Sequence, residues 1–277
     1  MIDRSALLAM PPIVTRQRLE ARDTILYALG VGEESLPYTY EAALRALPTM
    51  AVVIGYPGFF WRDPAIGADW ARILHGEQFL TIHAELPAEG DFIGETRIEE
   101  IWDKGPEKGA IALVTRDIRL ADGTLLATAR SNTFLRGDGG CGGPSDGTPK
   151  PHPIPDRAPD ASITLATRPG QALLYRLSGD LNPLHIDPAV AAGAGFPRPI
   201  LHGLCTYGVV GRALLHSLAG GNPGRLKRMD ARFSAPVFPG ETIETSIWHE
   251  AGGRAAFRAR VVERDHVVMT NGLVEVA

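Results

Sequence analysis

The densest cluster of polar side chains in the sequence lies in residues 175–188, YRLSGDLNPLHIDP. Within it, Asp180 and His185 are five positions apart, about 17 Å if the chain were extended at about 3.3 Å per residue. The pair Asn182-Pro183 stands between them and is typical of a turn. A turn here would place a carboxylate and an imidazole around one small volume, where they can position and deprotonate a water molecule.

An ordinary surface loop explains the same residues. Asp and Asn side chains commonly accept hydrogen bonds from backbone N–H groups two or three positions ahead, and His185 would then cap a neighbouring segment. Spacing alone favours the plain turn, because short polar residues are common in turns, while the catalytic loop remains open at this point.

A second candidate lies in residues 197–208, PRPILHGLCTYG, which lead into a helix predicted over Tyr207–Leu218. Backbone N–H groups at a helix N-terminus are unpaired and partially positive. Gly203 has no side chain, so a ligand carbonyl can approach its N–H and form an oxyanion-type site. The alternative is a glycine that allows close packing of the helix on a sheet.

Weaker signals indicate what the chain does not do. Residues 137–142 match the letters G-x-G-x-x-G, but Pro144 and more loop follow instead of a helix, which excludes a dinucleotide site. Cys205 is predicted to be a buried packing residue and not a nucleophile. The histidines form no H-x-H or H-E-x-x-H pattern, so we predict no metal and no cofactor. Four cations are interpreted as solvated surface: Arg22, Lys104, Lys108 and Arg136.

The composition bounds the class of protein. The 277 residues are 44% apolar with a net charge of −4, and the absence of a basic surplus argues against a nucleic-acid partner. No apolar run approaches the roughly 18 residues of a membrane span. Two cysteines suit a reducing compartment. With too short an apolar run for a signal peptide near the start and no peroxisomal address at the end, we expect a cytoplasmic protein.

Residues 137–159 divide the chain, because 12 of these 23 residues are Gly or Pro. We interpret this stretch as a linker between an N-terminal half, 1–136, and a C-terminal half, 160–277. The halves resemble diverged copies: Ile73–Gly76 recurs as Ile200–Gly203, and each copy is followed by a Pro-containing turn and three strand-like runs.

The alternation of apolar and polar residues in these runs predicts half-buried antiparallel strands. They are Phe92–Trp102, Ala110–Leu120 and Thr124–Leu135 in the first half, and Thr242–Trp248, Arg254–Glu263 and Val267–Val276 in the second. Each half also has one predicted helix, Thr15–Leu29 and Tyr207–Leu218. The sequence therefore predicts an α+β fold in which an antiparallel sheet packs on a helix, present twice.

The pattern Tyr175-x-x-Ser-Gly-Asp-x-Asn-Pro-Leu-His185 resembles the signature of (R)-specific 2-enoyl-CoA hydratases, the hydratase 2 or MaoC-like dehydratase family. Resemblance to the two-half, eukaryotic-type form extends from Arg22-Asp23 to residues 236–242, PVFPGET. It implies a double hot-dog fold with one active site, in which the second half is catalytic and the degenerate first half accommodates the acyl tail.

The resemblance also implies the activity and its residues. The expected reaction is the reversible hydration of trans-2-enoyl-CoA to (3R)-3-hydroxyacyl-CoA, by a lyase of fatty acid metabolism that often forms a homodimer. Asp180 and His185 would be the catalytic pair, Asn182 would support the loop or touch the thioester, and the Gly203 N–H would bind the thioester oxygen. The expected substrate-binding residues are His75, Gly76, Lys104, Leu181, Pro183, Leu184 and Phe233.

Two rival functions use the same class of ligand. A hot-dog acyl-CoA thioesterase typically presents a carboxylate from its central helix or a facing strand, and residues 204–218 of the predicted helix region contain no Asp or Glu. A non-catalytic acyl-thioester binding subunit needs neither Asp180 nor His185, and both are present. The hydratase is therefore the preferred hypothesis.

Overall fold

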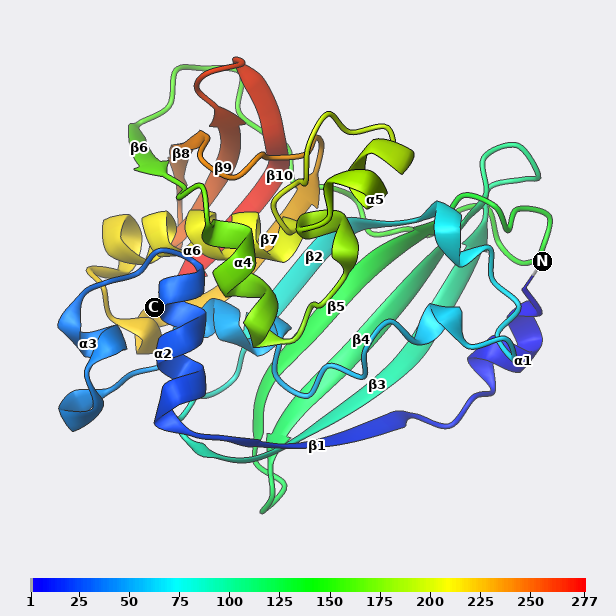
Figure 1. The fold of residues 1–277 in the computed structure, drawn as a ribbon, viewed down its shortest axis with the longest axis horizontal. Coiled ribbons are helices and arrows are strands. Elements are labelled where there is room, and N and C mark those ends of the chain that lie inside the picture. Colours follow the sequence, from blue (N-terminus) through cyan, green and yellow to red (C-terminus); the bar gives the residue numbers. More distant parts are fainter. Residues whose placement is uncertain (1) are drawn as a thin grey trace.

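The computed structural model describes residues 2–277 and contains one ten-stranded antiparallel sheet (Figure 1). The strand order is β1-β3-β4-β5-β2-β7-β10-β9-β8-β6. The strands of the first half are β1 (Ile13–Leu19), β2 (Ile73–Ile82), β3 (Gly90–Asp103), β4 (Ala110–Leu120) and β5 (Leu125–Leu135). Those of the second half are β6 (Ala161–Ala166), β7 (Leu226–Phe233), β8 (Thr242–Glu250), β9 (Arg254–Val261) and β10 (His266–Val276).

The two halves repeat the same strand arrangement about the centre of the sheet. β2 and β7 pair there in antiparallel fashion, with Phe79 opposite Asp230, and the other four strands follow outward in matching order. The six predicted runs fall on β3, β4 and β5 and on β8, β9 and β10. The predicted α+β class with a sheet in each half is therefore confirmed, and the two sheets are joined into one.

The four-residue identity that suggested the duplication does not mark equivalent positions. Ile73–Gly76 begins strand β2, whereas Ile200–Gly203 leads into a helix, so this identity is coincidental. The Pro-containing turns do correspond, because residues 86–91 lead into β3 and residues 236–241 lead into β8. The repeat is real at the level of element order.

The helix predicted over Thr15–Leu29 is wrong in its first part. Residues 13–19 form β1, which pairs with β3 at one edge of the sheet. Helix α2 (Ala21–Gly30) begins only after Glu20, whose side chain forms a reciprocal capping box with Asp23. Backbone pairing with β3 therefore outweighs the helical spacing of the apolar residues before this cap.

The second predicted helix lies within α6 (Gly203–Ala219), which ends at Gly220 in the left-handed conformation, φ +62°. Helix α6 packs closely because glycines face its neighbours. A Cβ on Gly208 would lie 2.4 Å from Val31 Cγ1, and one on Gly211 would lie 2.5 Å from Thr49 Cγ2. The remaining helices are short: α1 (Arg4–Leu8), α3 (Leu36–Thr39), α4 (Gln171–Tyr175) and α5 (Pro188–Gly193).

The halves differ in what covers the sheet. In Figure 1, α2, α4 and α6 gather at one side of the molecule, whereas β3, β4 and β5 are crossed by irregular chain with only short helical turns. Residues 41–72 form short 3₁₀ turns where a copy of α6 would otherwise be expected. One apolar core nevertheless spans both halves and includes Leu80, Ile118, Val210 and Phe257.

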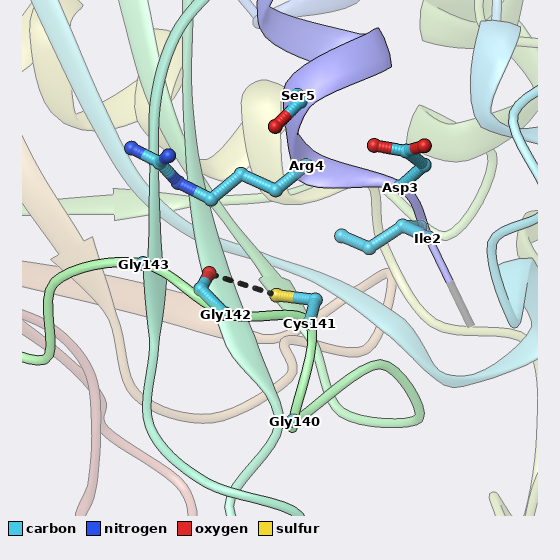
Figure 2. A pocket seen from close by; sticks show the side chains of 8 residues that line it. All are labelled: Ile2, Asp3, Arg4, Ser5, Gly140, Cys141, Gly142 and Gly143. Atoms are coloured by element: carbon cyan, nitrogen blue, oxygen red, sulfur yellow. Dashed lines mark hydrogen bonds between the residues drawn. The ribbon is translucent and has the colours of Figure 1, made fainter.

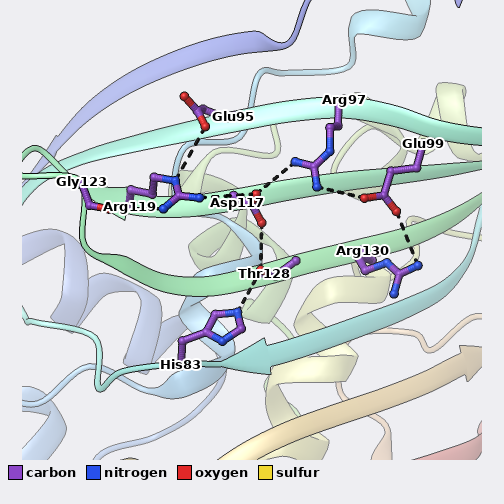
Figure 3. A network of polar contacts seen from close by, with 9 residues as sticks. All are labelled: His83, Glu95, Arg97, Glu99, Asp117, Arg119, Gly123, Thr128 and Arg130. Atoms are coloured by element: carbon purple, nitrogen blue, oxygen red, sulfur yellow. Dashed lines mark hydrogen bonds and ion pairs between the residues drawn. The ribbon is translucent and has the colours of Figure 1, made fainter. Parts of the chain in front are cut away.

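The opposite face of β3, β4 and β5 is polar, as strand alternation requires. Figure 3 shows Arg97 between Asp117 and Glu99, with N–O distances of 3.1 and 2.9 Å, and Thr128 Oγ1 donating to Asp117. These are partly exposed ion pairs of the kind that contribute little to stability. The helices and 3₁₀ turns pack against the other face.

The Gly/Pro-rich stretch contains no helix or strand between residues 136 and 160. Its first part folds back onto Asp103 at the end of β3: Oδ1 accepts hydrogen bonds from Gly105 N and Gly140 N, and Oδ2 accepts one from Gly142 N. These bonds lower the pKa of Asp103. The backbone N–H groups of these glycines therefore bind a carboxylate of the chain itself, that of Asp103. This agrees with the exclusion of a dinucleotide site.

Candidate active site

The loop that contains Asp180 and His185 turns back on itself, as the pair Asn182-Pro183 predicts. Asp180 Oδ1 accepts a hydrogen bond from Asn182 N, and Asn182 Oδ1 accepts one from Leu184 N, both at 3.1 Å. A 3₁₀ turn over Pro183–His185 completes the reversal. The Asx turns of the plain-loop interpretation are thus present, and they bring Asp180 Oδ2 to 4.0 Å from His185 Nε2.

Hydrogen bonding defines the tautomer of His185. Its Nδ1 lies 2.9 Å from the carbonyl oxygen of Ile200, which can only accept, so Nδ1 carries the proton. Nε2 of the neutral ring is then a free acceptor that faces Asp180. The ring is only 8% exposed, and burial lowers its pKa, which keeps it neutral at pH 7.

The separation of 4.0 Å is too long for a direct hydrogen bond and suits a bridging water. The carboxylate oxygen and the imidazole nitrogen are both acceptors, so one water molecule can donate a proton to each. If the water oxygen lies about 2.8 Å from both atoms, the angle between Oδ2, the water oxygen and Nε2 is about 90°, close to the H–O–H angle of water. The Asp180 side chain is 42% exposed, so the pair is open to an incoming ligand.

Gly203 is the first residue of α6, so its N–H has no partner within the helix. The Phe233 ring lies beside it, 3.5 Å from the position that a Cβ on Gly203 would occupy. The ring of His75 meets Phe233 edge-on, with the centroids 5.1 Å apart. The structure thus places these three predicted residues together, although they come from β2, β7 and α6.

His202, which is not among the residues predicted for the site, joins the two groups of residues. Its Nε2 lies 3.2 Å from the backbone oxygen of Asp180, and its ring stacks on His185 with the centroids 3.7 Å apart. It immediately precedes Gly203, so the Asp–His pair and the free helix N–H are neighbours. The signal for His202 in the sequence is its place directly before Gly203, the residue predicted to bind the thioester oxygen.

The other predicted residues have different surroundings. Leu181 and Pro183 are exposed on the loop between Asp180 and His185, and Leu184 is half-buried. Lys104 Nζ donates to the carbonyl oxygen of Ser145 in the Gly/Pro-rich stretch. Gly76 is buried under the ring of Phe134, where a Cβ would lie 2.6 Å from Cζ. The contacts of Gly76 therefore explain it as a packing residue.

Three potential metal ligands approach one another: Asp180, His185 and His202 have ligand atoms within 4.8 Å. The two imidazoles are stacked at an interplanar angle of 28°. Ring lone pairs lie in the ring planes, so two nearly parallel rings do not direct them at one ion. The cluster does not fit a metal site of ordinary geometry.

Cys205 is fully buried, with its Sγ 3.4 Å from the Gly30 carbonyl oxygen. Burial raises its pKa, so the predicted packing role is confirmed. A hollow of about 450 Å³ lies elsewhere, between the start of α1 and residues 140–143 (Figure 2). Its one thiol, Cys141, donates to the Gly142 carbonyl oxygen, and none of the predicted site residues lines it.

Comparison with known proteins agrees with this geometry. Residues 18–137 match the model of the MFE-2 hydratase 2 N-terminal domain, and residues 151–272 match the MaoC like domain. The chain is 45% identical to 3-hydroxyacyl-thioester dehydratase Y of Mycobacterium tuberculosis, covering 92% of this chain and 91% of that one. It is 37% identical to "Enoyl-CoA hydratase 2, peroxisomal" of Arabidopsis thaliana, covering 98% and 94%.

Solved structures give the same result. A MaoC-like dehydratase from Phytophthora capsici superposes with a TM-score of 0.90 at 37% identity, covering 99% of this chain and 98% of that one. A Mycobacterium tuberculosis protein with a double hot-dog fold superposes at 0.60 with 16% identity over 96% and 95% of the two chains, which supports the fold alone. The predicted double hot-dog is confirmed, and the chain belongs to the enoyl-CoA hydratase 2 family of MaoC-like dehydratases.

Proposed function

We propose that this chain is an (R)-specific 2-enoyl-CoA hydratase that adds water to trans-2-enoyl-CoA to give (3R)-3-hydroxyacyl-CoA. The observation that carries the proposal is the 4.0 Å gap between Asp180 Oδ2 and His185 Nε2, beside the free N–H of Gly203. Asp180 and His185 can each accept a hydrogen bond from one water, and the Gly203 N–H can donate to an oxygen atom of the substrate.

Each group has one task in the reaction. The Gly203 N–H donates to the thioester oxygen and stabilises the negative charge that develops there as the enoyl group is attacked. The water held by Asp180 and His185 adds its oxygen to the β-carbon. The pair accepts one proton from this water and returns one to the α-carbon, so the net change is the addition of one H₂O.

Asn182 acts through the loop in this scheme. Its side chain accepts from Leu184 N and keeps Asp180 and His185 on the same side of the turn. We assign Leu181, Pro183, Leu184, His75 and Phe233 to the rim that contacts the substrate, and Lys104 to the CoA portion. The proposed substrate is an acyl-CoA thioester, with no metal or organic cofactor.

The two halves have different roles in the proposal. Asp180, His185 and Gly203 all lie in residues 160–277, which we regard as the catalytic half, joined to residues 1–136 by the 137–159 linker. In the first half, short 3₁₀ turns stand where the second half has a 17-residue helix. A half without that helix is suited to accommodate an acyl tail against β3, β4 and β5.

The test follows the conjugated enoyl band of a short and a long trans-2-enoyl-CoA, with free thiol measured in the same reaction. Loss of the band without thiol release means hydration. Thiol release would support the thioesterase instead, and no change in either signal would support a binding subunit. Adding a (3S)-specific hydroxyacyl-CoA dehydrogenase with NAD should give no NADH if the product is the 3R isomer.

We also propose a cytoplasmic homodimer. Both cysteines are free thiols, which suits a reducing compartment, and no helix among residues 2–277 is long and apolar enough to cross a membrane. Light scattering should give about twice the 29.7 kDa chain mass. Cell fractionation tests the location, since the Arabidopsis relative is named as peroxisomal.

A further inference from the structure

His202 is the most enclosed ionisable group at the proposed site. Its side chain is fully buried, with the His185 ring 3.7 Å away on one side and the Tyr175 ring 5.1 Å away on another. No step of the hydration described above uses it. Its ring nevertheless contacts both members of the catalytic pair, the imidazole of one and the backbone of the other.

The hydrogen bonds of His202 define its tautomer. The backbone oxygen of Asp180, 3.2 Å from Nε2, can only accept, so Nε2 carries the proton. Nδ1 is then an acceptor, and it is buried without a hydrogen-bond partner among the residues that the structure describes. Burial, together with nearby His185, lowers the pKa of His202 to about 4, so the ring is neutral at pH 7.

This arrangement is costly for a residue that only fills space. A buried polar atom without a partner destabilises the folded state, and a phenyl ring fills a similar volume without that cost. What a phenyl ring cannot provide is the N–H that holds the Asp180 carbonyl. The histidine is therefore better explained by that donor than by packing.

We propose that His202 is a positioning residue for the hydration: its Nε2–H fixes the backbone of Asp180, and its ring backs the imidazole of His185. Both catalytic groups are thereby held by one rigid side chain at the start of α6. This inference rests on the proposed function and extends it. Small displacements of a catalytic group can cost about 100-fold in rate. A residue that fixes the spacing of Asp180 and His185 therefore maintains the rate of hydration.

Three variants separate positioning from packing. His202→Phe keeps a flat ring and removes the donor. His202→Gln removes the ring but keeps an N–H near the place of Nε2, whereas His202→Asn is one methylene shorter and its amide falls short of the Asp180 carbonyl. Tyr175→Phe is the matched control, because it alters the same cluster by removing a hydroxyl that has no partner among the described residues.

We expect His202→Phe to lower kcat for enoyl-CoA hydration about 10- to 100-fold with KM within about twofold of wild type. His202→Gln should recover part of that loss, His202→Asn should not, and Tyr175→Phe should keep wild-type kcat. If the Phe variant does not fold, the difference between Gln and Asn decides the question.

Other outcomes would overturn the inference. Wild-type kcat in a folded His202→Phe protein would show that the donor is dispensable. Equal losses in Gln and Asn, in step with equal losses of Tm, would mean that His202 only supports the fold. A wild-type protein without hydratase activity would remove the proposed function itself, and the inference with it.

Discussion

At the scale of single residues, the proposed mechanism has Asp180 and His185 hold one water together across their 4.0 Å separation, so neither would substitute for the other. We expect Asp180→Asn and His185→Gln each to lower kcat at least about 100-fold, the usual contribution of a positioned acid–base group. Steady-state hydration of an enoyl-CoA measures this. Asp187→Asn is the matched control, because Asn also caps α5 and the side chain lies outside the pair. Near-wild-type kcat in either catalytic variant would contradict the assignment.

Lys104 is the residue whose proposed role depends most on the resemblance. If its ammonium also reaches a CoA phosphate, Lys104→Ala should raise KM for enoyl-CoA about tenfold and leave kcat nearly unchanged, because that contact would stabilise ground and transition states equally. Lys108→Ala, on the same turn and exposed, should change neither constant. An unchanged KM in the Lys104 variant would mean that Lys104 is a solvated surface residue that does not contact CoA.

At the scale of elements, the close packing of α6 depends on glycine. Gly208→Ala should destabilise by about 1–3 kcal/mol and lower Tm by about 3–10 °C, because the new methyl would meet Val31 and overpack the core. Gly193→Ala in α5 meets open space and should leave Tm unchanged or slightly higher. Thermal unfolding of both variants checks this, and equal Tm values would mean that α6 shifts freely.

The elements also show which parts of the fold the sequence could predict. β3–β5 and β8–β10 alternate clearly because one face is apolar and the other is solvated. β2 and β7 were missed because polar residues are buried along them: Glu77 with Asn132, and Asp230 with Arg228. Glu77 meets Asn132 only once β2 pairs with β5, and the buried Asp230, paired with Arg228 on the same strand, interrupts the apolar pattern of β7, so alternation does not identify these strands.

The candidate site also has one part that the sequence predicts and another part that it does not. Asp180, Asn182 and His185 lie within one turn, so their types and spacing were sufficient to predict that they converge. The contact of His75 with Phe233 requires β2 beside β7, and the stacking of His202 on His185 requires the start of α6 beside the loop. Such contacts depend on long-range packing, which spacing along the chain does not encode.

At the scale of the whole molecule, buried neutral histidines tie stability to pH. In the unfolded chain His185 and His202 titrate near 6.5, whereas folding lowers both pKa values, that of His202 to about 4. Between these values the unfolded state binds more protons, so stability falls as pH falls from about 6.5 towards about 4. We expect urea unfolding to show several kcal/mol less stability at about pH 4.5 than at about pH 7.

The His202→Gln variant supplies the control for this pH dependence. It lacks one of the three histidines whose pKa the fold lowers (His75, His185 and His202), so its loss of stability between the same pH values should be smaller than that of the wild type. A wild-type stability that does not change over this range would mean that the histidines are not held neutral by the fold.

The pairing of β2 with β7 has a consequence for how the two halves depend on each other. Strand pairing joins backbone to backbone and makes few demands on side-chain identity. The first half therefore needs no long helix of its own to supply β2, the edge on which the second half completes its sheet. A substitution that weakens the first half would therefore also expose the edge of β7 and disturb the second half, even where it changes no residue of that half.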